Sequence, residues 1–242
     1  MQDWKQNLYN RYLTSGQSGT NINLNTGFVL DDYQYFSRVI KHHLPQKKDI
    51  KILDLACGYG ALIYCLKQFG YKNIEGIDIS LEQVELAHKL GLKEIKCQNI
   101  MGFLVDKSDA FDVIFLMDII EHLDKKELFS LLDKVFLSLK ANGIIVIHCP
   151  NGEGIFGMRI RYGDLTHENC FTPQSIRQLL KSCGFYSINC FEDKPIIHGL
   201  KSFFRYILWI SLTAPVRLLF AAETGIIKQV FSQNMLITAR KK

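Results

Sequence analysis

The sequence has no apolar run of signal-peptide length among its first twenty residues, which are polar throughout. Nothing there is typical of a secreted protein. It also has no Cys-x-x-Cys pair, and its seven cysteines are scattered along the chain at Cys57, Cys65, Cys97, Cys149, Cys170, Cys183 and Cys190. Such a set favours reduced thiols over disulfides or a zinc site. We therefore expect a cytoplasmic protein.

Internal repeats of fixed period and low-complexity stretches are also missing. With 22% of the residues charged and 12% aromatic, the composition excludes a disordered chain. At 242 residues, of which 48% are hydrophobic, the chain can bury one large core. We expect one elaborated domain rather than two independent ones.

Acidic residues are scarce in the C-terminal segment. From Pro195 to Lys242 there are seven Lys and Arg but only one acid, Glu223, which gives +6 where the whole chain carries +5. A nucleic-acid binder more often spreads its basic residues over a groove with interleaved aromatics. The uneven pattern therefore favours an anionic or membrane-surface contact and predicts no nucleic-acid partner.

The middle of the chain alternates short apolar runs with amphipathic helical patterns, which is typical of β-α units around a parallel sheet. We expect strands at 50–55, 73–78, 94–97, 112–117, 144–149, 186–191 and 235–239, and helices at 31–43, 61–69, 81–90, 125–140 and 172–183. The predicted α/β domain consists of a helical cap (1–47), a Rossmann-like core (48–193), a basic, apolar helical insertion (194–233) and a last strand (234–242).

A glycine-rich turn follows the first expected strand. Gly58 and Gly60 let the backbone turn tightly and approach a ligand, in front of a helix whose first N–H groups are unpaired. A dinucleotide fingerprint needs a further small residue where this chain has Ile63, so no pyrophosphate site is complete. Asp54, four residues before the first glycine, can instead orient an ammonium group.

A second acid, Asp78, ends the next expected strand, twenty residues after Gly58. A carboxylate at that strand end is placed to accept both hydroxyls of a ribose. The alternative is that Asp78 only caps the helix expected from Leu81.

These residues resemble a known family. Asp54-x-x-x-Gly58-x-Gly60 and Asp78 are similar to the first two motifs of the class I S-adenosylmethionine-dependent methyltransferases. The stretches 111–118 and 143–145 resemble the fourth-strand and fifth-strand motifs, and the likeness extends from about residue 33 to residue 191.

The resemblance implies S-adenosylmethionine as the cofactor. It also implies a Rossmann-like, seven-stranded, mostly parallel sheet of order 3-2-1-4-5-7-6 with the seventh strand antiparallel, and it places Asp118 beside the methionine part of the cofactor. The family often has an acid near the adenine where this chain has Gln98-Asn99-Ile100. We therefore expect Asn99 at the adenine edge and Ile79 and Ile100 on its faces.

The acceptor side of the site should come from the loops after the fourth and fifth strands. Methyl transfer from a sulfonium is an in-line displacement that needs alignment, exclusion of water and, for a hydroxyl acceptor, removal of a proton. No metal is needed. His122 and His167 are the candidate bases, although His122 can equally serve structure.

Within the loop after the fifth expected strand, the stretch 157–168 is too polar for a core. Arg159, Arg161 and Tyr162 are its candidate acceptor-binding residues, because two arginines can hold a phosphate or carboxylate. The alternative is a solvated loop whose Arg and Asp residues pair with one another.

The stretch 157–185 resembles methyltransferases of bacterial capsule and lipopolysaccharide gene sets. That resemblance implies an acceptor such as a sugar nucleotide, a phosphorylated sugar or a lipid-linked glycan precursor in cell-surface polysaccharide biosynthesis, but it does not identify the methylated atom. We expect O-methyl transfer to a small-molecule or lipid-linked glycan acceptor. Two alternatives stay open: a nucleotide-sugar oxidoreductase or epimerase, and a cofactor-binding but inactive partner subunit.

The segment 201–228 is apolar, aromatic and basic. Only eleven residues separate Arg205 from Arg217, and Pro215 interrupts them, so we expect no membrane-crossing helix of roughly twenty residues. A helical pair covering the sheet and a homodimer contact are two interpretations. A third is a peripheral contact with the inner face of the membrane, in which Arg205, Arg217 and Lys228 meet anionic lipid.

Overall fold

The computed structural model describes residues 30–242, so residues 1–29 of the expected N-terminal cap lie outside the described residues. Its strands are β1 (Lys51–Leu55), β2 (Asn73–Asp78), β3 (Ile95–Cys97), β4 (Phe111–Met117), β5 (Leu139–Pro150), β6 (Phe185–Glu192) and β7 (Asn234–Lys241). They form one seven-stranded sheet of order β3-β2-β1-β4-β5-β7-β6, with β7 antiparallel to both of its neighbours. The expected fold class and strand order are confirmed.

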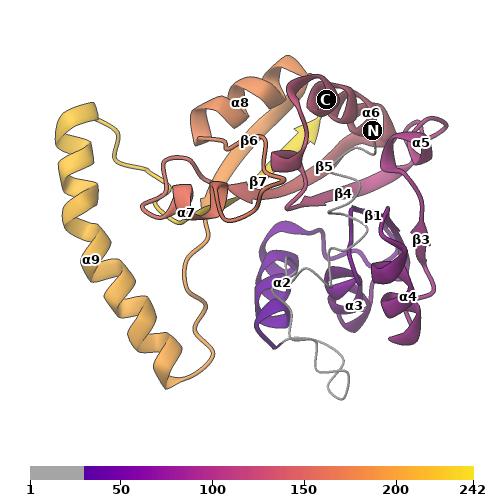
Figure 1. Cartoon of the computed structure of the whole chain (residues 1–242), viewed down its shortest axis with the longest axis horizontal. Coiled ribbons are helices and arrows are strands. Elements are labelled where there is room, and N and C mark those ends of the chain that lie inside the picture. The colour runs from indigo at the N-terminus through magenta and orange to yellow at the C-terminus, as the bar shows by residue number, and fades with distance from the viewer. Residues whose placement is uncertain (1–29) are drawn as a thin grey trace.

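Helices cover both faces of this sheet (Figure 1). They are α2 (Leu30–His43), α3 (Ala61–Gln68), α4 (Leu81–Lys89), α5 (Ile100–Phe103), the 3-10 turn η1 (Ile120–His122), α6 (Lys125–Ser138), α7 (Gly157–Arg161), α8 (Pro173–Ser182) and α9 (Leu200–Thr224). The helices α2, α3 and α4 lie on one face, and α6 and α8 lie on the other.

Alternating residues of the central strands supply the two halves of the core. Leu53 and Ile114 pack with the helices α6 and α8, whereas Ile52 and Val113 pack with α2, α3 and α4. All four side chains are fully buried. A parallel strand that is covered on both faces is apolar at every position, which is why short apolar runs predicted these strands so well.

One helix boundary differs from the expected one, and another is confirmed by its capping contacts. The helix expected at 125–140 ends at Ser138, and Leu139 already pairs with Phe111 as the first residue of β5. The helix expected from Thr172 is confirmed as α8, where the Thr172 hydroxyl accepts the N–H of Ser175 and Pro173 occupies the first helical turn.

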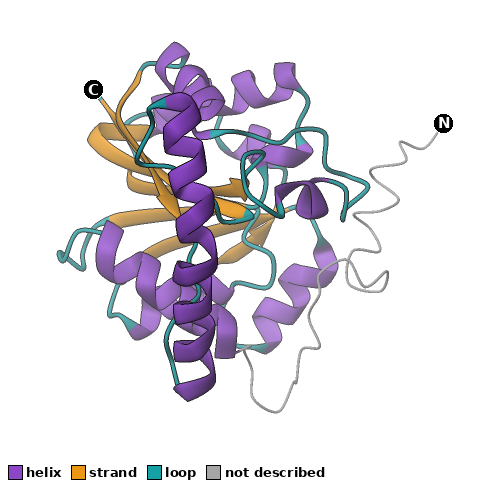
Figure 2. Ribbon diagram, turned by 90° about the vertical axis from the view of Figure 1, so that its left-hand side faces the viewer, coloured by secondary structure: helices purple, strands orange, loops and turns teal. Residues whose placement is uncertain are grey.

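The segment between β6 and β7 contains α9, a single helix of 25 residues that runs through Pro215. The expected break at Pro215 and the helical pair covering the sheet are therefore both wrong. Proline removes one backbone hydrogen bond, yet this helix continues past it. Figure 2, viewed from the side where α9 lies, shows it as one rod running along the height of the molecule.

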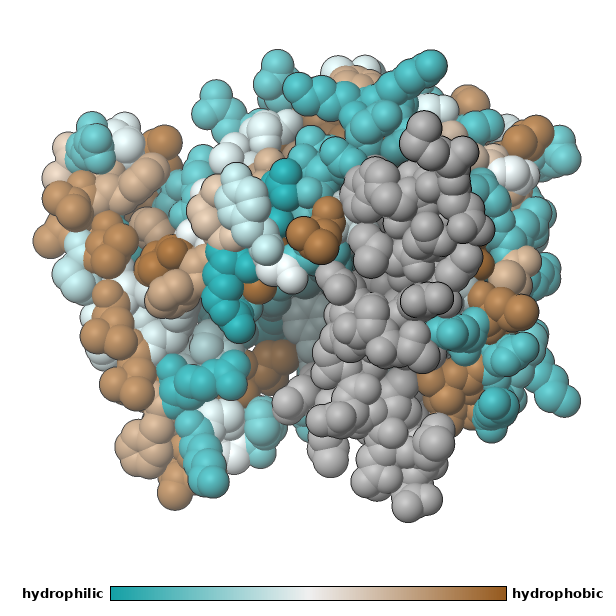
Figure 3. All heavy atoms as spheres, in the orientation of Figure 1, coloured by the Kyte–Doolittle hydropathy of each residue, from teal (hydrophilic) through white to brown (hydrophobic). Residues whose placement is uncertain are grey.

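The exposed side chains of α9 are mostly apolar, and three of its polar residues, Ser202, Thr213 and Arg217, are buried or half-buried. Its buried residues are Ser202 and Thr213, and Arg217 donates to Glu192 of β6 over 2.5 Å. Leu208 and Leu212 are more than half exposed. Figure 3 shows hydrophobic side chains gathered over α9 at the outer edge of the molecule. The expectation that Arg217 points to lipid is wrong, because its guanidinium is paired within the protein.

By length and composition alone, α9 is also the one helix within residues 30–242 that is long and apolar enough to cross a membrane, with a mean hydropathy of 1.3 over its eighteen-residue window. The argument from sequence against such a length is therefore overturned. The strands on either side of this insertion stay paired, since Glu192 of β6 lies opposite Met235 of β7.

Candidate active site

The turn between β1 and α3 brings the backbone close to the strand ends. Gly58 and Gly60 both have positive φ angles, of 54° and 86°, which favour glycine. A Cβ atom on Gly60 would also lie 2.5 Å from Ile95 and 2.6 Å from Leu92. Gly58 lines two cavities, whereas Gly60 lines neither of them and serves the close packing of the turn against β3.

Asp78 holds this turn in place. Its Oδ2 accepts the N–H of Gly58 over 2.7 Å, and its Oδ1 accepts the N–H of Ser80 over 2.8 Å. The helix α4 is capped by Ser80, whose hydroxyl accepts the N–H of Gln83. The capping alternative for Asp78 is therefore wrong, and its carboxylate lies at a cavity wall.

The smaller of the two cavities has a volume of about 330 Å³. Ile79 and Ile100 belong to its apolar lining, and Asp78 and Asp118 also line it. Asn99 also lines it, but its Oδ1 accepts the N–H groups of Met101 and Gly102 at the start of α5. Only the amide N–H₂ of Asn99 is therefore available as a donor to a bound ring.

The larger cavity is open, has a volume of about 760 Å³ and shares Gly58, Asp118 and His122 with the smaller one. Asp54 also lines it. Its side chain is fully buried, and its Oδ1 has no hydrogen-bond partner. Burial, followed by the negative charge of Asp78, raises the pKa of Asp54 well above its usual range. A cationic group placed beside Asp54 would relieve this cost.

Asp118 belongs to a charged network that the sequence did not predict. Its carboxylate, on a residue with the unusual φ of 51°, lies 2.6 Å from Nδ1 of His148 in β5. His148 also contacts Asp193 over 3.4 Å, and Asp193 pairs with Arg38 of α2. Burial alone would lower the pKa of His148, but the two carboxylates raise it well above the usual value. A histidine near the end of an otherwise apolar strand was the one available signal.

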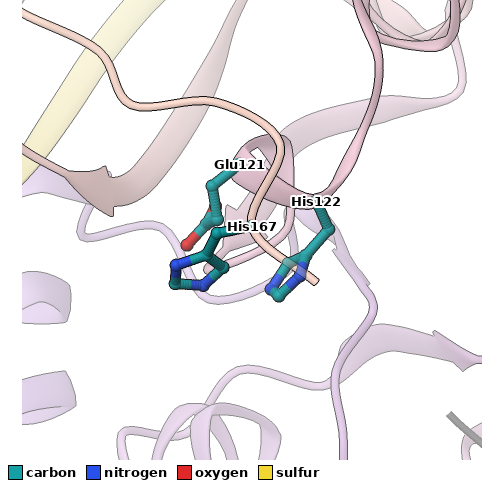
Figure 4. A group of neighbouring side chains, drawn as sticks. All are labelled: Glu121, His122 and His167. Atoms are coloured by element: carbon teal, nitrogen blue, oxygen red, sulfur yellow. The ribbon is translucent and has the colours of Figure 1, made fainter. Parts of the chain in front are cut away.

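His122 and His167 lie next to one another, with ring centroids 4.7 Å apart (Figure 4). Nδ1 of His122 lies 2.7 Å from the hydroxyl of Thr166, and that hydroxyl donates to Asp164 over 2.5 Å. Because a hydroxyl has one proton to give, Nδ1 of His122 must be the donor to Thr166. The lone pair of the neutral ring is then on Nε2.

The same argument fixes the tautomer of His167. Its Nδ1 lies 3.0 Å from the carbonyl oxygen of Ile160, which can only accept. Nε2 of His167 therefore carries the lone pair as well. Burial, then the neighbouring His167, lowers the pKa of His122 to about 4, so His122 is neutral at physiological pH.

The loop that carries His167 is anchored by Arg161, whose guanidinium donates to the carbonyl oxygens of His167 and Glu168. Arg161 therefore positions this loop and does not line the larger cavity. Tyr162 is exposed beside Arg161 and does not line it either. The Arg–Asp pairing expected for a solvated loop is not what holds these residues.

Arg159 does line the larger cavity. No hydrogen bond or ion pair of its guanidinium is found among the described residues, so it can contact a bound anion.

Comparison with known proteins assigns the family. The model of a family described as "Methyltransferase domain" matches residues 29–189, which include the glycine turn, Asp78 and the two histidines. The chain belongs to the methyltransferase-domain family. The oxidoreductase or epimerase alternative is thereby rejected.

Curated relatives of this methyltransferase differ in substrate. The chain is 27% identical over 103 residues to the mitochondrial ubiquinone biosynthesis O-methyltransferase of Saccharomyces cerevisiae. The aligned region covers 40% of the chain and 33% of that protein. It is 26% identical over 170 residues to the tRNA U34 carboxymethyltransferase of Histophilus somni, which covers 65% of the chain and 51% of that protein. The chain thus spans about a third to a half of the length of these relatives.

Solved structures share the fold of this methyltransferase. A S-adenosylmethionine-dependent methyltransferase from Archaeoglobus fulgidus superimposes with a TM-score of 0.65 at 21% identity, over 86% of this chain and 94% of that one. Phosphoethanolamine N-methyltransferase 2 of Haemonchus contortus, in complex with S-adenosyl-L-methionine, gives a TM-score of 0.60 at 16% identity, over 86% of this chain and 52% of that one.

S-adenosylmethionine is the cofactor of this methyltransferase, and the observed cavities fit it. The buried, unpaired Oδ1 of Asp54 suits the ammonium group, and the apolar walls at Ile79 and Ile100 suit an aromatic ring. When bound, the cofactor supplies an electrophilic methyl group on a sulfonium. The protein's residues have to hold that group against an acceptor.

Proposed function

We propose that this methyltransferase transfers the methyl group to a hydroxyl oxygen of a small acceptor bound in the larger cavity. The observation that carries the proposal is the pair of Nε2 lone pairs on His122 and His167, in a cavity that also contains Asp54 and Asp118. A hydroxyl must lose its proton as it is methylated, whereas an amine acceptor can attack as its neutral form without such help. The name of the yeast relative, an O-methyltransferase, supports the same choice.

We assign the cofactor contacts residue by residue. The carboxylate of Asp78 receives the ribose hydroxyls, and that of Asp54 receives the ammonium group. Ile79 and Ile100 enclose the adenine, and the amide N–H₂ of Asn99 donates to its edge. The backbone of Gly58 lies beside the cofactor. Asp118 contacts its methionine end, and His148 holds the carboxylate of Asp118 in place.

The acceptor is proposed to be anionic or sugar-linked. Arg159 supplies a cationic side chain in the larger cavity, next to Asp164 and His167 in the lining. A role in cell-surface polysaccharide biosynthesis rests on the resemblance of residues 157–185 alone, since the curated relatives named above act elsewhere. Arg161 and Tyr162 contribute by shaping the loop rather than by contacting the acceptor.

The test is a turnover assay with a panel of hydroxyl-bearing phosphorylated sugars, nucleotide sugars and lipid-linked glycans. Arg159→Ala should raise KM for an anionic acceptor about tenfold, with unchanged cofactor affinity, because one charged hydrogen bond is lost. Lys181→Ala, which removes an exposed cation on α8, is the matched control. Normal cofactor binding with no turnover on any hydroxyl acceptor would favour the inactive partner subunit instead.

We also propose that α9 contacts the cytoplasmic face of a membrane. Its outer face presents Leu208, Leu212 and Leu218 to solvent, and such contiguous apolar exposure usually marks an interaction surface. The exposed cations Lys201 and Arg205 of α9 favour an anionic lipid surface over a second copy of the chain. A homodimer joined through α9 is the outcome that would replace this proposal.

A further inference from the structure

We propose that Glu121, His122 and His167 form a binding site for a divalent transition-metal cation at the wall of the larger cavity. One ligand atom from each of these side chains lies within 4.8 Å of the other two. Figure 4 shows that Glu121 and His122 come from η1 and that His167 comes from the loop that folds over it. All three residues line the larger cavity, so a cation has a path of entry.

The two histidines are prepared as ligands by their other ring nitrogen. Nδ1 of His122 donates to Thr166, which donates to Asp164, and Nδ1 of His167 donates to the carbonyl oxygen of Ile160. Metal-binding histidines are typically oriented in this way, by a hydrogen bond from the nitrogen that does not bind the metal. Both rings therefore carry the lone pair on Nε2, the nitrogen through which a neutral imidazole binds a cation.

Glu121 supplies the independent indication that a cation belongs here. The residue is 1% exposed, and its buried Oε2 accepts no hydrogen bond. A buried carboxylate without a partner is costly, and coordination to a cation is one of the few ways to offset that cost.

The backbone around the site is also fixed. The carbonyl oxygen of Glu121 accepts the N–H groups of Glu168 and Asn169, over 2.7 and 2.9 Å. Arg161 holds the carbonyl oxygens of His167 and Glu168. The loop that brings His167 to η1 is thus tied down on both sides, which is the preorganisation that a metal site requires.

Two imidazoles and one carboxylate suit manganese, iron, cobalt or zinc rather than magnesium or calcium, which prefer oxygen ligands. Three protein ligands leave coordination positions for water or an acceptor oxygen. Asp118 and Asp164 add negative charge nearby. The sequence-based expectation that the reaction needs no metal is replaced by this proposal.

The role of the cation rests on the proposed function. A divalent cation that binds the acceptor's hydroxyl lowers the pKa of that hydroxyl, so that the oxygen can attack the methyl carbon while the carbon–sulfur bond breaks. The hydroxyl proton then leaves to solvent, and the two imidazoles hold the cation instead of the proton. An acceptor with two neighbouring oxygens would be favoured, because it could occupy two coordination positions.

The experiment is calorimetric titration of the chelator-treated, full-length protein with Mn²⁺, which the seven free cysteines bind less readily than softer cations. We expect one Mn²⁺ per chain. Glu121→Gln and His167→Ala should each weaken binding at least tenfold. Thr166→Val should weaken it by about 10- to 100-fold, because it removes the hydroxyl that fixes the His122 tautomer. His42→Ala, a histidine exposed on α2, is the matched control.

Unchanged Mn²⁺ affinity in both Glu121→Gln and His167→Ala, with intact thermal unfolding, would overturn the site. No binding to the unmodified protein would overturn it too. If Mn²⁺ binds at this site but chelation leaves turnover unaltered, the site stands and its role in the reaction is rejected. If Mn²⁺ binds and no hydroxyl acceptor is methylated, the proposed function fails while the site remains.

Discussion

Replacing Asp78 by alanine should weaken both the cofactor complex and the fold. The carboxylate accepts the N–H of Gly58 at 2.7 Å and that of Ser80 at 2.8 Å, with only 8% of the residue exposed. Hydrogen bonds to a charged group contribute roughly 1.5–3 kcal/mol each. Burial raises the pKa of Asp78 despite these bonds, which means that part of their gain offsets the cost of desolvating the charge.

We therefore expect Asp78→Ala to lower the free energy of unfolding by about 2 kcal/mol, less than the sum of the two bonds because the cost of desolvating the charge is removed with them. For a domain of this size, that loss corresponds to a fall of about 4–8 °C in melting temperature. Loss of the ribose contact should cost about 2 kcal/mol of binding free energy. Cofactor affinity should then fall roughly thirtyfold, because 1.4 kcal/mol corresponds to a factor of ten. Differential scanning calorimetry and isothermal titration calorimetry measure the two effects separately.

Glu75→Gln is the matched control, because Glu75 lies on the same strand and pairs with Lys96 at 3.4 Å in an exposed position. An exposed pair contributes only about 0.2–1 kcal/mol, so stability should change little and cofactor affinity not at all. If Asp78→Ala remains folded and binds the cofactor normally, the ribose role is rejected. An unchanged melting temperature would instead show that the two backbone contacts contribute nothing net.

Two further predictions concern Asp54 and α9. Because the pKa of Asp54 is raised in the fold, the cofactor-free protein should lose stability as pH rises through that pKa, and Asp54→Asn should remove this dependence. Cofactor affinity should rise over the same pH interval, because binding releases the proton of Asp54. Calorimetry in two buffers of different ionisation enthalpy detects that proton. An affinity that does not depend on pH would place the ammonium group elsewhere. For α9, part of the protein should sediment with anionic vesicles at low salt. The double variant Leu208→Glu and Leu212→Glu should reduce the sedimented fraction. A dimer that stays in the supernatant would show that α9 joins two copies of the chain.

The parts of the molecule that the sequence predicted are those set by local rules. Short apolar runs identified the buried strands, and glycines followed by a helical pattern identified the turn at Gly58 and Gly60. The strand order came from the resemblance and not from periodicity, because periodicity does not say which strands are neighbours. Asp54 and Asp78 were found because both lie within a few residues of their own strand ends.

The missed features depend on contacts between distant residues. His148 meets Asp118 and Asp193, which are 30 and 45 positions away, and no local pattern relates them. Glu121 was overlooked because an acid next to a histidine at a helix start is common, and only its burial makes it unusual. Pro215 misled the prediction of α9, since the cost of about 3 kcal/mol for a proline can be exceeded by the rest of a long helix.

The pairing of Glu192 with Met235 has a consequence for how this protein can change over evolutionary time. The chain leaves the sheet at the end of β6 and returns at the start of β7, at two points that are neighbours across an antiparallel pair, roughly 5 Å apart. A shorter connection that keeps Asp193 and the buried residues Val230, Phe231 and Ser232 could join these points without altering the register of any strand. The part of the chain that carries α9 is therefore a module that can be lengthened, exchanged or deleted, while the residues around Asp54 and His167 keep their positions. A grafted loop at this point would produce a compact variant whose chemistry can be studied apart from its surroundings.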